Sequence, residues 1–252
     1  MITRDQLVHA CDARLQPERF KDYTVNGLQV AGRDQVGKVM SGVTASQALL
    51  DEAVAWGADL VLVHHGYFWK NEPLEITGMK RRRLATLLGH DISLLAYHLP
   101  LDAHPELGNN ARLAAELDFR VQRCIDGELG EGLVWLGAPP AGLDSAGLGR
   151  HLAQRLGREP LVIPGHEREI KHVAWCTGGA QDMIGLAADA GADAFVSGEI
   201  SERTTHLARE LGISYFAAGH HATERYGAKA LGEWLADEFA VEHRFVDIDN
   251  PA

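Results

Sequence analysis

Histidines and carboxylates occur together at four places in the sequence, each at the end of a short apolar run. In open parallel sheets ligands bind beyond the carboxyl ends of the strands, so residues at these places are expected to meet. The four segments are His64-His65-Gly66, His98-Leu99-Pro100-Leu101-Asp102, Ser197-Gly198-Glu199 and Gly219-His220-His221-Ala222-Thr223-Glu224. Any one of these histidines alone could be an ordinary strand-end residue, but the clustering favours a metal site. Imidazole and carboxylate ligands suit Zn, Mn, Fe or Co.

The spacing within two of these segments indicates how ions would be held. His220 and Glu224 are four residues apart, so a helix there would place both side chains on one face, within reach of one ion. His64 and His65 are adjacent, and adjacent side chains of an extended strand point to opposite sides. Either one of them is structural, or the pair serves two ions about 3.5 to 4 Å apart with a bridging carboxylate such as Asp102 or Glu224.

The period of the apolar residues predicts the elements that position these segments. Strands are expected at residues 39–43, 60–63 and 92–97, with helices at residues 45–56 and 79–88. Strands that alternate with helices over such short connections indicate a parallel sheet with helices packed on its faces.

The same order of elements returns later in the chain. Strands are expected at residues 173–176, 194–197 and 213–218, with helices at residues 181–190 and 202–211. The turn tripeptides Gly57-Ala58-Asp59 and Gly191-Ala192-Asp193 are identical, which supports an internal duplication. Residues 133–136, 148–156 and 161–163 are expected to form extra elements between the copies.

We therefore predict an α/β fold of two duplicated βαβαβ halves with mostly parallel sheets and the metal site between the halves. Residues 1–130 form the first half and residues 131–252 the second. No linker is long enough to separate the halves, so we expect one compact unit.

Composition narrows the classes of function. The 24 Lys and Arg against 35 Asp and Glu give a formal charge of −11, which argues against duplex nucleic acid as a partner. No apolar run approaches the ~18 residues of a membrane span, and the charged N-terminal stretch does not fit a signal peptide, so we expect a cytoplasmic protein without membrane contact. Cys11, Cys124 and Cys176 are far apart and predict neither a disulfide framework nor a thiolate zinc site.

Six motifs in this order resemble the NIF-three-like family, whose members are known as GTP cyclohydrolase 1 type 2 homologues. They are Asn26-Gly27-Leu28-Gln29-Val30, the His64 and His98 segments, Gly108-Asn109-Asn110, and the Ser197 and Gly219 segments. The resemblance extends from about Asn26 to Gly227 and fits the short bacterial form of the family. It implies two similar α/β halves, a ring-shaped homohexamer and two divalent transition metal ions per chain. The implied metal ligands are His64, His65, Asp102, His220 and Glu224.

The first functional hypothesis is a metal-dependent hydrolase that acts on a nucleotide-like or phosphorylated small molecule, with GTP as one candidate. Two metal ions would lower the pKa of a bound water to about 7 and polarise the bond under attack. His98 and Glu199 are candidates for proton transfer, although each could instead orient a ligand. The alternative hypothesis is a non-catalytic protein whose dinuclear centre is structural, delivers metal or senses it. The sequence selects neither the substrate nor the metal.

Four other features have simpler interpretations. Lys80-Arg81-Arg82-Arg83 could hold a phosphate but more often such a run is a solvated helix face. Helix capping explains at least one of Asn109 and Asn110. Trp69 could stack on a base, although packing is the simpler interpretation, and His221 is expected to support the ligands rather than bind metal.

Overall fold

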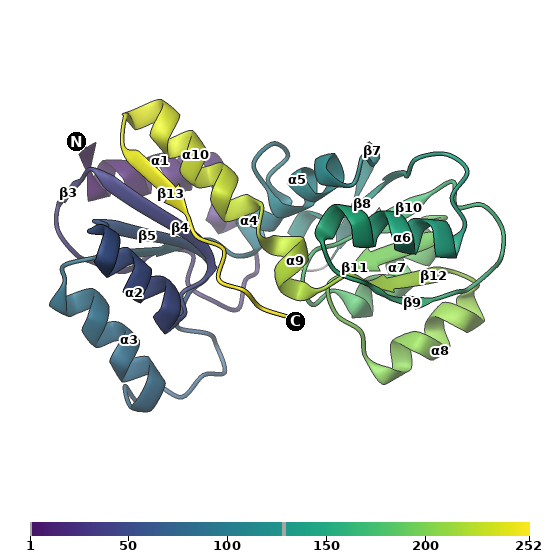
Figure 1. The fold of residues 1–252 in the computed structure, drawn as a ribbon, viewed down its shortest axis with the longest axis horizontal. Coiled ribbons are helices and arrows are strands. Elements are labelled where there is room, and N and C mark those ends of the chain that lie inside the picture. The colour runs from purple at the N-terminus through teal and green to yellow at the C-terminus, as the bar shows by residue number, and fades with distance from the viewer. Residues whose placement is uncertain (1, 128–129) are drawn as a thin grey trace. The chain divides into compact units, whose positions relative to one another are not determined.

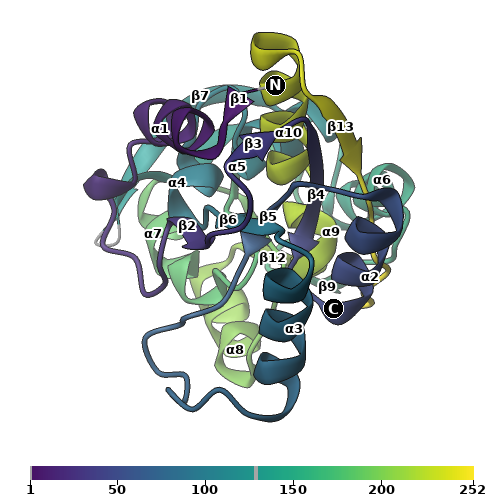
Figure 2. The same ribbon diagram turned by 90° about the vertical axis from the view of Figure 1, so that its left-hand side faces the viewer.

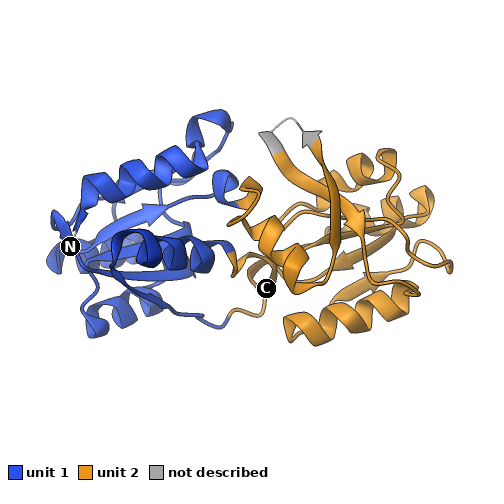
Figure 3. Ribbon diagram, turned by 90° about the horizontal axis from the view of Figure 1, so that it is seen from above, with its two compact units in different colours: residues 1–101, 227–249 blue, residues 102–226, 250–252 orange. Residues whose placement is uncertain are grey.

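The structure, a computed structural model, describes residues 2–127 and 130–252, which form two units (Figure 3). Unit 1 comprises Met1–Leu101 and Gly227–Asp249, and unit 2 comprises Asp102–Tyr226 and Asn250–Ala252. These ranges differ from the expected halves 1–130 and 131–252. The difference arises because helix α10 (Gly227–Phe239) and strand β13 (Glu242–Phe245) complete the sheet and helices of unit 1.

The main sheet of unit 1 has the strand order β13-β4-β5-β6-β2. Neighbouring strands run parallel from β13 to β6, and the edge strand β2 is antiparallel to β6. The remaining strands are β2 (Gly27–Val30), β4 (Lys38–Thr44), β5 (Leu60–His65) and β6 (Ser93–Ala96). β5 is buried along nearly all its length, as its continuous apolar run predicts for an inner strand.

Helices lie on both faces of this sheet (Figures 1 and 2). α2 (Gln47–Trp56) and α3 (Gly78–Gly89) cover one face and share a buried cluster with it through Leu49 and Leu87. α1 (Arg4–Leu15) and α10 lie on the other face. The sequence sets the ends of α2 locally, because the Ser46 side chain accepts a hydrogen bond from the backbone N–H of Leu49 and Gly57 ends the helix with φ of 72°.

The sheet of unit 2 has the strand order β7-β8-β10-β11-β12-β9 and is mixed. Only β10, β11 and β12 run parallel to one another, and the other neighbours are antiparallel. The strands are β7 (Arg120–Gly127), β8 (Gly130–Ala138), β9 (Leu161–Ile163), β10 (Val173–Trp175), β11 (Ala194–Ser197) and β12 (Ser214–Ala217). The expectation of mostly parallel sheets therefore holds for unit 1 but is wrong for unit 2, because the β7–β8 hairpin extends its sheet.

Two buried clusters line the two faces of the unit 2 sheet. Leu113 of α5 (Asn109–Glu116) and Leu148 of α6 (Ser145–Leu156) pack with Trp175 in one cluster. Ile184 of α7 (Ile184–Asp189) and Ala208 of α8 (Glu202–Leu211) belong to the other. Both units thus hold a sheet between helices, which is a mixed α/β architecture.

The two units repeat one order of elements. β2-β4-α2-β5-α3-β6 in unit 1 corresponds to β9-β10-α7-β11-α8-β12 in unit 2, including the antiparallel pairing of the first strand with the last. The repeat therefore begins earlier than the sequence predicted, because residues 161–163 belong to the second copy and are not an extra element. β2 has the equivalent place in the first copy.

Hydrogen bonds around the identical Gly-Ala-Asp turns repeat as well. The Asp59 carboxylate accepts from two successive backbone N–H groups at the start of β4, 2.8 and 2.9 Å away, and from Arg33. The Asp193 carboxylate accepts from two successive N–H groups just before β10, both 3.0 Å away, and from Arg168. In each copy the aspartate thus joins its own turn to the start of the neighbouring strand.

Shorter elements complete the described chain. They are β1 (Ile2–Thr3) paired antiparallel with β3 (Gln35–Val36), the 3-10 turns η1 (Pro17–Arg19) and η2 (Gln181–Met183), and the short helices α4 (Leu99–Ala103) and α9 (His220–Glu224). No helix within residues 2–127 and 130–252 has the length and apolarity needed to cross a membrane.

Candidate metal centre

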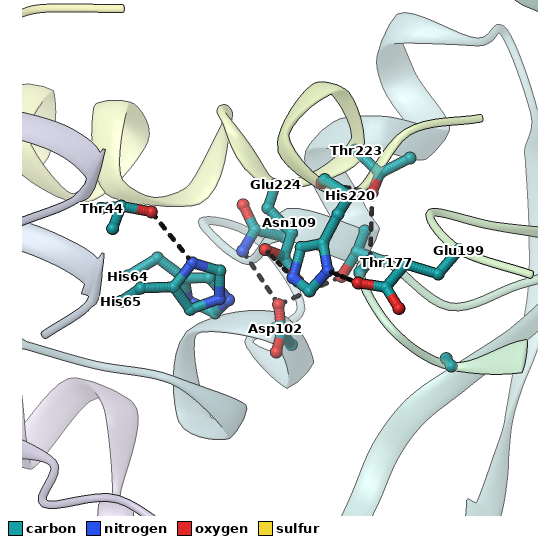
Figure 4. A network of polar contacts seen from close by, with 12 residues as sticks. Thr44, His64, His65, Asp102, Asn109, Thr177, Glu199, His220, Thr223 and Glu224 are labelled. Carbon is teal, nitrogen blue, oxygen red and sulfur yellow. Dashed lines mark hydrogen bonds and ion pairs between the residues drawn. The ribbon is translucent and has the colours of Figure 1, made fainter. Parts of the chain in front are cut away.

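His64 and His65 lie at the carboxyl end of β5 (Figure 4). His64 is fully buried, and its Nδ1 lies 2.9 Å from the backbone carbonyl oxygen of Tyr97. A carbonyl only accepts hydrogen bonds, so Nδ1 holds the proton of the neutral ring and Nε2 has the lone pair that a metal requires.

His65 is half-buried, and its Nδ1 lies 3.2 Å from Oγ1 of Thr44 at the end of β4. The centroids of the His64 and His65 rings are 4.5 Å apart, so the expectation that the two rings point to opposite sides is wrong. His65 is the last residue of β5, so the regular alternation of an extended strand ends at this position.

His98 joins these two histidines from the end of β6. One ring nitrogen from each of His64, His65 and His98 lies within 4.8 Å of the other two, close enough for the three to hold one metal ion. Nδ1 of His98 is 2.9 Å from Oδ1 of Asp22, and both side chains are at least nine-tenths buried. Burial alone would raise the pKa of Asp22, but hydrogen bonds from His98, Asn26 and Leu99 outweigh burial and lower it.

Two aromatic rings border His98 in unit 1. The rings of Tyr23 and Trp69 each lie 5.1 Å from the His98 ring in edge-on contacts, and they are 5.8 Å from one another. The Trp69 indole N–H donates to the carbonyl of Gly66. Trp69 therefore packs against the histidines, in agreement with the simpler interpretation of this residue.

In unit 2, a buried network holds the carboxylate of Asp102 (Figure 4). Its Oδ1 accepts from Nδ2 of Asn109 at 2.9 Å and from Oγ1 of Thr177 at 3.1 Å. Asn110 donates to the backbone carbonyl of Asp102 at 3.2 Å and accepts from the backbone N–H of Thr177. The expectation that Asn109 or Asn110 caps a helix is wrong, because Gly108 is the N-cap of α5 and both side chains face this network.

His220 and Glu224 lie on α9, as their spacing predicts, and their side chains meet. Nε2 of His220 is 3.0 Å from Oε2 of Glu224, and Nδ1 is 2.6 Å from Oε1 of Glu199 at the end of β11. Burial alone would lower the pKa of His220, but the hydrogen bonds and charges of Glu224 and Glu199 outweigh it and raise the pKa to about 9. Without metal, the ring is therefore an imidazolium at neutral pH, hydrogen-bonded to Glu199 and ion-paired with Glu224.

In unit 2, a glycine lets the backbone come close to the carboxylate of Glu224. Gly178, which follows β10, has φ of +67°, and a Cβ built on it would lie 1.9 Å from Oε1 of Glu224. The Gly178 backbone N–H donates to Oγ1 of Thr223 at 3.0 Å, which ties the loop to α9. Only glycine fits this close approach of the backbone to the carboxylate.

Three residues of the networks in the two units lie outside the sequence-based prediction: Asp22 in unit 1, and Thr177 and Gly178 in unit 2. The strand-end rule could have found the last two, because they follow the predicted strand 173–176 as the histidines follow theirs. Asp22 lies in a segment without regular structure, and its pairing with His98 depends on tertiary contacts.

The basic run and His221 take ordinary structural places. Arg81 and Arg82 are exposed on α3, whereas Lys80 pairs with Glu72 at 3.2 Å. The run is therefore largely a solvated helix face, as the simpler interpretation has it. His221 is buried, and its backbone N–H donates to the carbonyl of Ala252.

Two mixed α/β units that present histidines and carboxylates at strand ends define a class of protein with a candidate histidine-rich metal site. Residues 2–251 match one protein family over nearly the whole chain. The chain belongs to the Duf34/NIF3 (NGG1p interacting factor 3) family.

Relatives agree with this assignment. The chain is 55% identical to a "GTP cyclohydrolase 1 type 2 homolog" of Pseudomonas aeruginosa, with 100% of this chain and 99% of the relative covered. It is 52% identical to a protein of the same description in Escherichia coli K12, with 98% of each chain covered. Among solved structures, it resembles "protein ybgI, unknown function" with a TM-score of 0.95 at 51% identity over the full length of both chains. Thermus thermophilus TTHA1606 is similar with a TM-score of 0.88 at 36% identity, again over both full lengths.

Proposed function

We propose that this protein binds two divalent transition metal ions in one dinuclear centre and uses them to hydrolyse a nucleotide-like or phosphorylated small molecule. The ligands in this proposal are His64, His65, Asp102, His220 and Glu224. The observation that supports it most is the fixed ring of His64, whose Nδ1 is 2.9 Å from a carbonyl oxygen, so that Nε2 has the lone pair.

The donor set of each unit fits such ions. Metal–ligand bonds of 2.0 to 2.2 Å bring the ligand atoms of one ion to about 3 to 3.5 Å from each other. Nε2 of His220 and Oε2 of Glu224 are 3.0 Å apart, which is a spacing two ligands of one ion adopt. The Asp102 carboxylate is oriented by Asn109 and Thr177, as ligating carboxylates commonly are by hydrogen bonds.

Metal ions bound there would acidify water and polarise the bond under attack, as divalent cations do in hydrolases. In the proposal, His98 moves a proton at Nε2, because its Nδ1 is engaged by Asp22. Glu199 holds Nδ1 of His220 and thereby orients that ring, or exchanges a proton with substrate. The description of the relatives suggests GTP, for which water would attack C8 of the guanine ring.

Metal content and turnover test the proposal in sequence. Purified protein is analysed for transition metals by mass spectrometry before and after reconstitution with Zn, Fe, Mn or Co. We expect up to two ions per chain, fewer in Asp102→Asn, and an unchanged number in Asp189→Asn, an exposed carboxylate on α7 that serves as a matched control. Less than one bound ion per chain after reconstitution would refute the metal site.

A substrate panel then separates the hydrolase from a metal-binding protein without turnover. GTP, nucleoside monophosphates and simple phosphoesters are incubated with wild type, Asp102→Asn and Asp189→Asn. We expect turnover in wild type and the Asp189 variant and its loss in the Asp102 variant. Equal, trace turnover in all three would reject the hydrolase and leave the structural, delivery or sensing role.

The proposal includes a homohexamer, which the family resemblance implies. Light scattering should give a mass near six chains of 27.4 kDa each. A monomer at all working concentrations would refute the hexamer without bearing on the metal ligands.

A further inference from the structure

One segment of unit 1, residues 22–26, holds both the ring and the backbone of His98. Nδ1 of His98 lies 2.9 Å from Oδ1 of Asp22, and the backbone N–H of His98 donates to Oδ1 of Asn26 at 2.7 Å. Oδ2 of Asp22 accepts from Nδ2 of Asn26 at 2.8 Å and from the backbone N–H of Leu99 at 3.1 Å. Asp22, Asn26 and His98 are thus joined in a closed network of hydrogen bonds.

This hydrogen-bond network selects one tautomer of the His98 imidazole. A carboxylate can only accept hydrogen bonds, so the contact between Oδ1 of Asp22 and Nδ1 of His98 requires the proton to be on Nδ1. Oδ2 of Asp22 already accepts from Asn26 and Leu99, which fixes the orientation of the carboxylate. The lone pair of the neutral ring is then on Nε2. A ring with the opposite tautomer would set two lone pairs against each other at Nδ1 and Oδ1.

Burial fixes this geometry further. The side chains of His98 and Asp22 are 8% and 4% exposed, so water does not compete for their hydrogen bond. The rings of Tyr23 and Trp69 each contact the His98 ring edge-on at 5.1 Å. His98 is therefore restrained on several sides, while one of its nitrogens remains within 4.8 Å of nitrogens of His64 and His65.

Unit 2 contains a similar chemical pair near the matching strand end. By strand register His98 corresponds to Gly219, and the neighbouring residue His220 has its Nδ1 2.6 Å from Oε1 of Glu199. In both copies a carboxylate thus contacts Nδ1 of a histidine that follows the last parallel strand, although neither the histidine nor the carboxylate occupies the same position in the two copies.

We propose that Asp22, supported by Asn26, is a positioning residue that holds His98 as the Nδ1–H tautomer and keeps Nε2 available for proton transfer. In this proposal, Asn26 of the Asn26-Gly27-Leu28-Gln29-Val30 motif orients Asp22 and the backbone of His98. The proton-transfer part rests on the proposed hydrolase function, whereas the tautomer of His98 can be measured without any substrate.

The tautomer is read from long-range ¹H–¹⁵N correlation spectra of histidine-labelled protein, metal-free and loaded with diamagnetic Zn²⁺. The His98 signals are identified by their loss in His98→Gln. We expect a pyrrole-type Nδ1 and a pyridine-type Nε2 in wild type. In Asp22→Asn, the amide can donate to Nδ1, so the Nε2–H tautomer should gain at least tenfold in population.

Matched variants separate positioning from packing. Asp22→Glu keeps the carboxylate and should keep the wild-type tautomer, and Glu18→Gln, an exposed carboxylate on η1, should leave the His98 signals unchanged. A wild-type tautomer in Asp22→Asn would overturn the proposal, as would an equal disturbance in Asp22→Glu and Asp22→Asn. If Asp22→Asn does not fold, Asp22→Ser, which also removes the carboxylate, gives the same measurement, and a wild-type tautomer there would overturn the proposal.

Turnover provides the second readout. Once a substrate is established, Asp22→Asn should lower kcat about 100-fold with little change in KM and no change in bound zinc, because general acid–base groups contribute 10²- to 10⁴-fold. An unchanged kcat would overturn the role in proton transfer. If wild type turns over no substrate, the hydrolase proposal fails while the spectra still decide whether Asp22 sets the tautomer.

Discussion

Replacing Gly178 by alanine should weaken metal binding by a steric effect on Glu224, a ligand of the proposed centre, within unit 2. A Cβ at this position would lie 1.9 Å from Oε1 and 2.9 Å from the carboxyl carbon of Glu224, and 3.1 Å from Nε2 of His220. Cβ atoms in proteins essentially never come closer than 3.0 Å to another heavy atom, so the Glu224 oxygen must move by about 1.1 Å. Metal ligands tolerate about 0.2 Å.

The loss in metal affinity follows from that displacement. Removal of a group that merely orients a ligand costs 10- to 100-fold in affinity. Displacement of the ligand itself should therefore cost at least about 100-fold, which is about 2.7 kcal/mol at 25 °C. The alanine also has to adopt φ of +67°, which costs about 1 to 2 kcal/mol of folding stability on its own.

A second glycine separates these two effects. Gly157 ends α6 with φ of +74°, and a Cβ there would meet nothing within 4 Å. Gly157→Ala should lose the same 1 to 2 kcal/mol in urea unfolding but bind zinc like wild type by calorimetry. The reasoning is refuted if Gly178→Ala binds zinc with wild-type affinity, or if Gly157→Ala loses affinity equally.

Three further predictions address the duplicated turn, the Asp102 network and a close backbone contact. Burial alone would raise the pKa of Asp193, but hydrogen bonds from His172, Arg168 and Lys171 outweigh burial and lower it. The ionised carboxylate therefore stabilises the fold above about pH 4, and this stabilisation is lost as the pH falls through the lowered pKa. The difference in unfolding free energy between wild type and Asp193→Asn should therefore be constant from pH 5 to 8 and shrink below pH 3.8, and a difference that grows in acid would contradict this. Asn109→Leu, which removes a donor to Asp102, should weaken zinc binding 10- to 100-fold by calorimetry, and unchanged affinity would speak against the network. Gly165→Ala would place a Cβ 2.4 Å from the backbone of Ile213 and should lower the free energy of unfolding by more than about 2 kcal/mol in urea titrations; a loss below 0.5 kcal/mol would show that the backbone gives way.

The sequence predicts the inner strands and their helices well, because each has a local signal. β5 is a continuous apolar run, and the structure places it at residues 60–65 in the buried middle of its sheet. Helix α3 spans Gly78–Gly89, where apolar spacing predicts residues 79–88. The positions of the polar residues at strand ends are predictable for the same reason, because each of them directly follows a strand whose end the sequence indicates.

The edges of the sheets are harder to predict, because they depend on pairing between distant segments. β9 has only three residues, and its exposed Leu161 gives no sign that it pairs with β12. β13 is a short strand in which exposed and half-buried residues alternate, and its parallel pairing with β4 makes it part of the unit 1 sheet. The partner of a buried histidine is equally non-local, as Asp22 and His98 are 76 residues apart.

The comparison of the two copies explains why this partner comes from so far away. By strand register, Leu60 pairs with Ser93 as Ala194 pairs with Ser214, so His65 of β5 corresponds to Glu199 after β11. In unit 2 that position supplies the carboxylate for Nδ1 of His220. In unit 1 this position is a histidine, which cannot act as an anionic acceptor, and the carboxylate at Nδ1 of His98 comes instead from Asp22. The two copies therefore differ at this strand end: unit 2 has a carboxylate there, whereas unit 1 has an additional imidazole of the candidate metal centre and an orienting carboxylate from a distant segment.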